Sequence, residues 1–177
     1  MLFRSIAYRL SDFRKALVNF TKAAELGSRD AQYLVGLMYS KGQGTAIDYD
    51  QAGHWYRRAA EQGHAGAQTN LGFIYANGLG LPRDFAEAAY WYGQAADQGA
   101  AKAQGYLAFM YQVGQGIPKD AVQAHKWFSL LAAGDDATET QNAKRVLALL
   151  EPTMTEAEIA EAQRLAGSWR AANQRRD

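Results

Sequence analysis

Closely spaced glycines are the first residues in this sequence that could do chemistry. The segment YANGLGLPRD, residues 75–84, contains a G-x-G, and glycines this close together can let a backbone wrap around a phosphate. A dinucleotide site needs a strand before the motif and a third glycine, and a P-loop needs G-K-[ST]. Here the G-x-G follows a helical pattern, recurs from Gly42 and from Gly114, and no G-K-[ST] occurs. We predict that these glycines turn the chain between helices and bind no cofactor, because glycine tolerates positive φ.

The histidines do not form a metal or catalytic pattern. None of His54, His64 and His125 lies four residues from another, as a two-histidine site on one helix would require. Cysteine is absent, which excludes disulfides, thiolate catalysis and cysteine-bound zinc. No G-x-S-x-G elbow occurs either. We therefore predict no catalytic residue, no metal site and no enzyme.

The elements that would position these residues belong to an internal repeat. Shifting the sequence by 36 residues aligns it with itself, which is the signature of a repeat architecture. The aligned sets are Tyr39/Tyr75/Tyr111, Gly42/Gly78/Gly114, Gly44/Gly80/Gly116, Asp48/Asp84/Asp120, Ala52/Ala88/Ala124 and Trp55/Trp91/Trp127. One further step back from Asp48 reaches Asp12, inside the second half of an earlier repeat. The chain thus contains half a repeat followed by three.

Each repeat is predicted to form two helices, A and B. In one repeat, helix A covers AGAQTNLGFIYAN and helix B covers FAEAAYWYGQAADQ. The aspartate before each helix B has Glu or Gln three residues later, which predicts a capping box and favours a structural role for that carboxylate. Gly27, Gly63 and Gly99 suit the left-handed residue that ends helix B. Gly36 is expected to face Ala52, so that helices A and B approach closely.

The tail beyond the third repeat departs from the repeat pattern and is predicted to form two closing helices. TETQ, residues 138–141, and TEAE, residues 155–158, both read as capping boxes, with Pro152 between them. Each tail helix carries one apolar stripe, which would pack against the array and leave a polar outer face.

Composition limits the class of partner. The formal net charge is +1 and charged residues make up 21% of the chain, which gives no electrostatic reason to expect nucleic acid. No apolar run approaches the roughly 20 residues of a membrane-spanning helix, so we expect no membrane insertion. The sequence leaves the compartment open between cytoplasm and periplasm, because no signal peptide is recognised and the native N-terminus could be missing. The oligomeric state is also left open.

The repeat pattern A-Q-x-x-L-G-x-x-Y-x-x-G-x-G-x-x-x-D-x-x-x-A-x-x-W-[YF] resembles the Sel-one-like repeat (SLR), a relative of the tetratricopeptide repeat (TPR). The resemblance covers about residues 11–134 and implies an all-α, right-handed α-solenoid of antiparallel helix pairs that binds proteins or peptides. We expect residues 1–10 to form an N-terminal segment of uncertain assignment, 11–134 the solenoid, and 135–177 a C-terminal cap. The family's disulfide-stapled secreted branch does not carry over, because this chain has no cysteine.

The predicted binding surface lies on helix A, which lines the concave groove in TPR-like solenoids. Columns that vary between repeats are free to recognise a partner, and the column of Leu37, Phe73 and Phe109 could form an apolar floor; core packing remains the alternative for that column. The candidate partner-binding residues are Tyr33, Leu37, Lys41, Asn70, Phe73, Asn77, Tyr106, Phe109 and Gln112.

The predicted function is a non-enzymatic scaffold or adaptor for a protein or peptide partner, in a bacterial signalling, regulatory or envelope setting. The alternatives are an accessory or regulatory subunit of an enzyme, or a hydrolase. A nucleic-acid-binding protein is disfavoured by the net charge.

Overall fold

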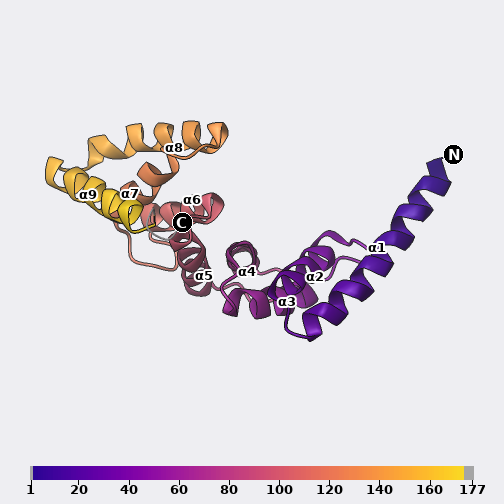
Figure 1. Cartoon of the computed structure of the whole chain (residues 1–177). Coiled ribbons are helices and arrows are strands. Elements are labelled where there is room, and N and C mark those ends of the chain that lie inside the picture. Colours follow the sequence, from indigo (N-terminus) through magenta and orange to yellow (C-terminus); the bar gives the residue numbers. More distant parts are fainter. Residues whose placement is uncertain (1, 174–177) are drawn as a thin grey trace. The chain divides into compact units, whose positions relative to one another are not determined.

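The computed structural model describes residues 2–173, and all regular structure in this range is helical. This confirms the predicted all-α class. The helices are α1 (Leu2–Glu25), α2 (Arg29–Lys41), α3 (Tyr49–Glu61), α4 (Ala65–Asn77), α5 (Phe85–Asp97), α6 (Ala101–Val113), α7 (Ala121–Leu131), α8 (Ala137–Leu150), the 3-10 helix η1 (Glu151–Thr153) and α9 (Glu156–Asn173). Figure 1 shows them in chain order.

The chain divides into two compact units, and each is described by itself. Unit 1 comprises Met1–Asp84, and unit 2 comprises Phe85–Asp177. In unit 1, α2 packs against α1 and α3, and α3 packs against α4. In unit 2, α6 packs against α5 and α7, and α7 packs against both α8 and α9. Helix A of the prediction corresponds to α2, α4 and α6, and helix B to α3, α5 and α7.

Several helix starts follow the predicted caps, and one does not. The carboxylate oxygens of Asp48 and Asp120 each accept a hydrogen bond of 2.9 Å from the backbone N–H three residues later. The capping box from Thr155 is also confirmed, because Thr155 N donates to Glu158 Oε2 at 2.8 Å and Glu158 N donates to Thr155 Oγ1 at 3.3 Å. The predicted box at Thr138 is wrong: the cap is Asp136, whose carboxylate accepts from the N–H of Thr138. Asp136 lies two residues before Thr138, and its carboxylate accepts the free N–H groups at the start of α8.

The repeated G-x-G turns the chain, as predicted. Gly42, Gly78 and Gly114 end the A helices with φ between 65° and 76°, in the left-handed region that favours glycine. The second glycine has another role, which the sequence did not reveal. A Cβ on Gly116 would lie 2.2 Å from the carbonyl oxygen of Phe85, so this turn packs directly on the backbone of the preceding helix B.

The core of each unit consists of alanines and large aromatic side chains. Ala52, Ala88 and Ala124 are fully buried, and the paired aromatics that follow them are at most 7% exposed. The aromatic pairs are Trp55/Tyr56, Trp91/Tyr92 and Trp127/Phe128. Gly36 was expected to face Ala52, but its nearest neighbour is Tyr56. A Cβ on Gly36 would lie 2.7 Å from the Tyr56 ring. The missing side chain therefore makes room for an aromatic ring.

A buried glutamine secures the start of each helix A. Gln32, Gln68 and Gln104 donate from Nε2 to the backbone carbonyls of Ala24, Ala60 and Ala96, at 3.0–3.3 Å. These carbonyls belong to the last turn of the preceding helix and also accept the backbone N–H of Gly27, Gly63 and Gly99, so each glutamine uses the second acceptor site of its carbonyl oxygen. The alanine–glutamine dipeptide of each repeat thus has a structural reason: alanine fits the core, and the buried glutamine amide is hydrogen-bonded to the end of the preceding helix.

The two tail helices keep the spacing of the repeat although their sequences depart from it. Helices α2, α4, α6 and α8 begin at Arg29, Ala65, Ala101 and Ala137, each 36 residues after the last. Helix α9 begins at Glu156, within one residue of the position that the same spacing gives for a helix B. Residues of α8 can therefore be matched with those of α4, at a distance of two repeats.

Candidate protein-binding surface

A pocket of about 200 Å³ lies on unit 1, between α2, α3 and α4. It brings together four of the predicted residues, namely Leu37, Lys41, Asn70 and Phe73. The remaining lining residues are Ser40, Tyr49, Tyr56 and Ile74. The residues come from both A helices and from the B helix between them, so the repeat packing itself forms the pocket.

Tyr56 supplies a buried polar group to this pocket. Its hydroxyl lies 3.0 Å from Ser40 Oγ and is also hydrogen-bonded by the side chain of Asn70. Burial raises the pKa of the Tyr56 phenol to about 12, because the charged phenolate would lose its solvation. The phenol therefore stays neutral under ordinary conditions and holds Ser40 and Asn70 in fixed positions.

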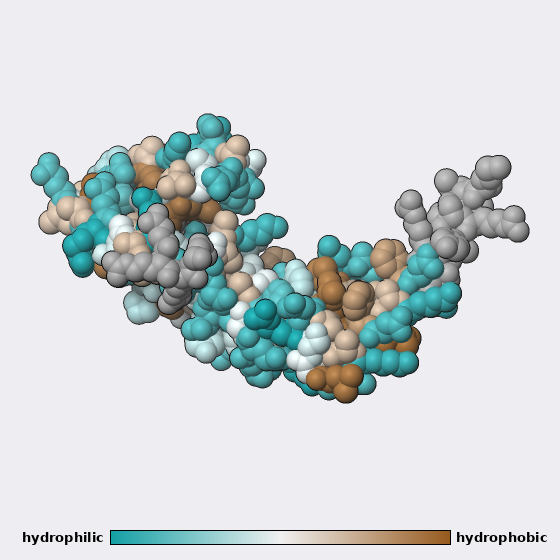
Figure 2. Space-filling model, viewed as in Figure 1, coloured by the Kyte–Doolittle hydropathy of each residue, from teal (hydrophilic) through white to brown (hydrophobic). Residues whose placement is uncertain are grey.

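The other lining residues are apolar or positively charged. Phe73 is 42% exposed and Leu37 is half-buried, so Phe73 belongs to the surface rather than to the core. Lys41 is exposed and is the one charged residue that lines the pocket; it forms no ion pair with another residue in the range the structure describes. Figure 2 shows hydrophobic residues reaching the surface of the molecule among polar ones. The arrangement suits an apolar side chain accompanied by a negative charge.

The two other candidates of unit 1 lie outside the pocket lining. The ring of Tyr33 stacks on the imidazole of His64 at 4.2 Å and lies 6.0 Å from the ring of Tyr56. Tyr33 is therefore packed against its own unit and is less free to contact a partner than the sequence suggests. Asn77 is exposed, and its Nδ2 donates to the carbonyl of Phe73 at 2.8 Å.

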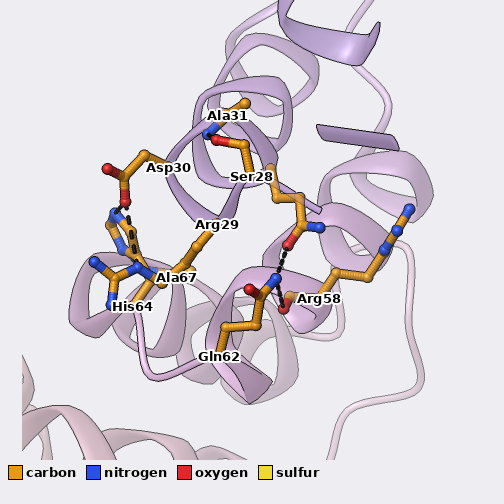
Figure 3. A network of polar contacts seen from close by, with 9 residues as sticks. Ser28, Arg29, Asp30, Ala31, Arg58, Gln62, His64 and Ala67 are labelled. Atoms are coloured by element: carbon orange, nitrogen blue, oxygen red, sulfur yellow. Dashed lines mark hydrogen bonds and ion pairs between the residues drawn. The ribbon is translucent and has the colours of Figure 1, made fainter. Parts of the chain in front are cut away.

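Polar contacts fix the start of α4 beside that of α2 (Figure 3). His64 caps α4, since its Nδ1 accepts from the N–H of Ala67 at 3.1 Å, and its Nε2 lies 4.0 Å from Asp30 Oδ1. Partial burial lowers the pKa of His64, and Asp30 opposes that shift. Gln62 Nε2 donates to Gln32 Oε1 at 2.7 Å. The network explains His64 as a helix cap and offers no reason to see it as a metal ligand.

Unit 2 carries the remaining three candidates. Tyr106 stacks on Tyr92 at 4.8 Å and is 41% exposed, and Phe109 is 51% exposed. Gln112 is half-buried. Only Tyr106 of these three lines a described pocket, which has a volume of about 310 Å³ and lies between α6, α7 and α8.

Sequence reasoning missed most of the residues that line this second pocket. They are Lys102, Gly105, Phe128, Leu131, Glu139, Asn142, Ala143 and Val146. The sequence assigns those on α8 to the C-terminal cap, because the sequence of that segment does not match the repeat pattern. The unbroken 36-residue spacing of helix starts is the signal that could have identified α8 as a further helix A.

The third histidine is buried and hydrogen-bonded through both ring nitrogens. His125 is 1% exposed; its Nε2 lies 3.0 Å from Glu151 Oε1 and its Nδ1 lies 3.1 Å from Ser129 Oγ. His54 is exposed beside the ring of Trp55. Within residues 2–173 no three histidines, aspartates or glutamates gather as a metal site would require.

Among the described residues, no helix combines the length and the apolar character that crossing a membrane would need.

Comparisons with known proteins agree with this architecture. The family model for the Sel1 repeat matches residues 1–28, 29–64, 65–99 and 101–136. A crystal structure of a Sel1 repeat protein from Oxalobacter formigenes is similar to this chain, with a TM-score of 0.70 and 32% identity over 80% of this chain and 58% of that one. A second is c5321, a protective antigen of uropathogenic Escherichia coli strains with an SLR fold, with a TM-score of 0.62 and 27% identity.

That second match covers 86% of this chain and 40% of the antigen, so the chain spans only part of either solved relative. No curated protein matches the sequence significantly. Proteins built from Sel1 repeats are generally protein-interaction scaffolds and typically lack enzymatic activity. The four repeat matches and the all-helical solenoid fold establish that this chain belongs to the Sel1 repeat family.

Proposed function

We propose that this protein is a non-enzymatic scaffold that binds a segment of a protein partner on the surface of its A helices. The observation that carries the proposal is the unit 1 pocket, in which four residues chosen from the helix-A columns meet. A bacterial signalling, regulatory or envelope setting is part of the proposal, and it is supported by the bacterial origin of both similar structures.

The size of the pocket favours a side chain over a small-molecule ligand. Sites for small molecules usually enclose about 300–1,000 Å³, whereas the unit 1 pocket has about 200 Å³. A side chain anchored in such a pocket is a common source of binding energy in protein interfaces. Leu37, Phe73 and Ile74 supply the apolar contact for that anchor.

The positive charge at the unit 1 pocket favours an acidic residue beside the anchoring side chain of the bound segment. Lys41 is its one charged lining residue, and its ammonium would attract a carboxylate on the bound segment. We therefore propose that the segment carries a large apolar residue beside an aspartate, a glutamate or a terminal carboxylate.

The test is selection of binding peptides from a random library, followed by titration against protein variants. Selected peptides should share the apolar–acidic pair, and Phe73→Ala should weaken them by about 1–2 kcal/mol or more, as loss of an interface anchor does. Lys41→Ala should weaken them less and reduce the dependence on salt. Leu26→Ala is the matched control, because Leu26 lies in the same unit and is 90% exposed. Equal binding by all three variants would reject the pocket as the site.

The hydrogen-bonded side chains of Ser129, His125 and Glu151 have the composition of a serine hydrolase triad. They are the one observation that supports the hydrolase alternative. In such triads Nε2 of the histidine faces the serine and Nδ1 faces the acid, whereas here the two nitrogens are exchanged. Ser129 also lies inside α7 and lines neither of the two pockets. We propose that these three side chains have a structural role and connect α7 to η1. Hydrolysis of p-nitrophenyl acetate that disappears in Ser129→Ala would contradict this.

A further inference from the structure

The first and third repeats differ where the A helix meets the following repeat. Two steps of the 36-residue period place Gly105 at the position of Tyr33. In unit 1 the Tyr33 ring fills this position: it lies 6.0 Å from Tyr56, and a Cβ on Gly66 would be 3.3 Å from its edge. In unit 2 no side chain extends from Gly105.

The space that Gly105 leaves coincides with the larger pocket. Gly105 lines it together with Phe128, which is the equivalent of Tyr56. Helix α8 enlarges the pocket further, because the small side chain of Ala143 stands where unit 1 has the larger Leu71. Leu131 recovers part of the space, since its Cδ2 would lie 3.5 Å from a Cβ on Gly105. The remaining volume is about 310 Å³.

The lining of this pocket suits an aromatic ring with a polar tip. Tyr106, Phe128 and Val146 provide apolar contact, and an apolar cavity of only about 150 Å³ is enough to hold benzene. Lys102, Glu139 and Asn142 supply donors and acceptors, and neither charged residue forms an ion pair with another residue in the described range. A buried tyrosine usually finds a hydrogen-bond partner for its hydroxyl.

We propose that the unit 2 pocket binds the side chain of a tyrosine from a protein partner, which restores the ring that Gly105 lacks. The inference rests on the proposed function only in that a bound protein segment would supply the tyrosine. The tyrosine pocket is formed by α6, α7 and α8, whereas the pocket of the proposed function is formed by α2, α3 and α4.

The experiment uses N-acetyl-L-tyrosinamide as the probe and the backbone amide signals of the full chain as the readout. The probe should shift amides around Gly105, Phe128 and Asn142 in a saturable manner. N-acetyl-L-phenylalaninamide should bind about 2- to 10-fold more weakly, because it lacks one hydrogen bond. The absence of saturable shifts in α6, α7 and α8 would overturn the proposal, and so would stronger binding of the phenylalanine probe.

Gly105→Tyr fills the pocket with the residue found in unit 1. This variant should lose the shifts while its melting temperature stays equal or rises, because glycine inside a helix is unfavourable. Gly167→Tyr is the matched control, since Gly167 lies in α9 with no atom within 4 Å of its Cβ position. Ala143→Leu fills the pocket from α8, and it should also lose the amide shifts. This variant tests the proposal if Gly105→Tyr does not fold. Shifts that persist in the filled variants would overturn the proposal.

Peptide selection and probe binding can fail separately. Peptides whose binding depends on Phe73, together with no response to the tyrosine probe, would leave the proposed function standing and reject the tyrosine pocket. A saturable, Gly105-dependent probe response without any selected peptide would support the tyrosine pocket and reject the site proposed on unit 1.

Discussion

The pockets of unit 1 and unit 2 share three lining positions and differ in what stands there. The equivalent pairs are Tyr56 and Phe128, Asn70 and Asn142, and Ile74 and Val146. In unit 1 a buried phenol is held by Ser40 and Asn70, and Lys41 is the single charge. In unit 2 the ring has no hydroxyl, glycine stands at the position of Tyr33, and charges of both signs line the pocket.

The comparison separates the positions that the repeats share from the positions that differ between the units. The alanine, glutamine and tryptophan columns are nearly the same in both units because they satisfy the core and the helix ends. The columns that line the pockets differ between the units in side-chain volume and charge. Substitutions that exchange residues between the units therefore test the comparison directly.

The largest effect is expected where the units are alike. Trp55→Ala in unit 1 and Trp91→Ala in unit 2 each remove a side chain that is 7% exposed, and loss of a buried tryptophan costs about 3–5 kcal/mol. Calorimetric melts should show a similar loss for both variants, and amide hydrogen exchange should locate it in the altered unit. A loss below about 1 kcal/mol in one variant would mean that the two tryptophans are not equivalent in the core.

The second prediction makes unit 1 resemble unit 2. Tyr33→Gly removes a half-buried ring and adds a glycine inside α2, which should together cost about 2–3 kcal/mol. The cleared space beside Tyr56 should admit N-acetyl-L-tyrosinamide, observed as new amide shifts in α2 and α4. Tyr33→Ala is the matched control for side-chain loss without the helix penalty. Retained stability in both variants would show that the stacking of Tyr33 on His64 contributes little.

The repeat scaffold was predictable from the sequence because each repeat provides an independent copy of the same signals. Asp48 and Asp120 cap the B helices, and the G-x-G glycines turn the chain, because local geometry dictates both roles. The sequence predicts an apolar column of Leu37, Phe73 and Phe109 without deciding between surface and core. The structure exposes Phe73 and Phe109 and leaves Leu37 half-buried.

The unit 2 pocket was not predictable because it depends on the missing side chain at Gly105 and on α8, whose sequence does not match the repeat pattern. In the sequence, Gly105 differs from Tyr33 and Thr69 at the equivalent positions, and variation alone does not distinguish an empty space from a solvated surface. Helix α8 preserves the spacing of the A helices, and Asp136 caps it where the equivalent positions hold Ser28, His64 and Ala100. Its contribution to the pocket becomes visible only when the helices are placed in space.

The third prediction concerns helix caps, which also differ between equivalent positions. Ser28, His64 and Asp136 each accept a backbone N–H, whereas Ala100 begins α6 with no side-chain cap. Ala100→Asp should therefore stabilise unit 2 by about 0.5–2 kcal/mol, measured by denaturant titration. Ala100→Asn separates the hydrogen bond from the charge, since it caps without adding one. No gain in either variant would show that the start of α6 already has its N–H groups satisfied.

The smallest effect, and the most specific to one unit, is expected from Tyr56→Phe, which gives unit 1 the ring of Phe128. At neutral pH the variant should lose about 0.5–1.5 kcal/mol, because the hydroxyl no longer pairs with Ser40 and Asn70. The pKa of Tyr56 is raised from 10.0 to about 12 in the folded protein, so between these values the folded state keeps a proton that the unfolded state has released. The stability of the wild-type protein should therefore fall as pH rises from 10 to 12, by about 1.4 kcal/mol per pH unit from this group. The variant lacks that ionisation, so its free energy of unfolding should fall less steeply, and the difference between the two proteins should shrink or reverse above pH 10. Parallel curves over this range would mean that the phenol is not buried as the structure shows.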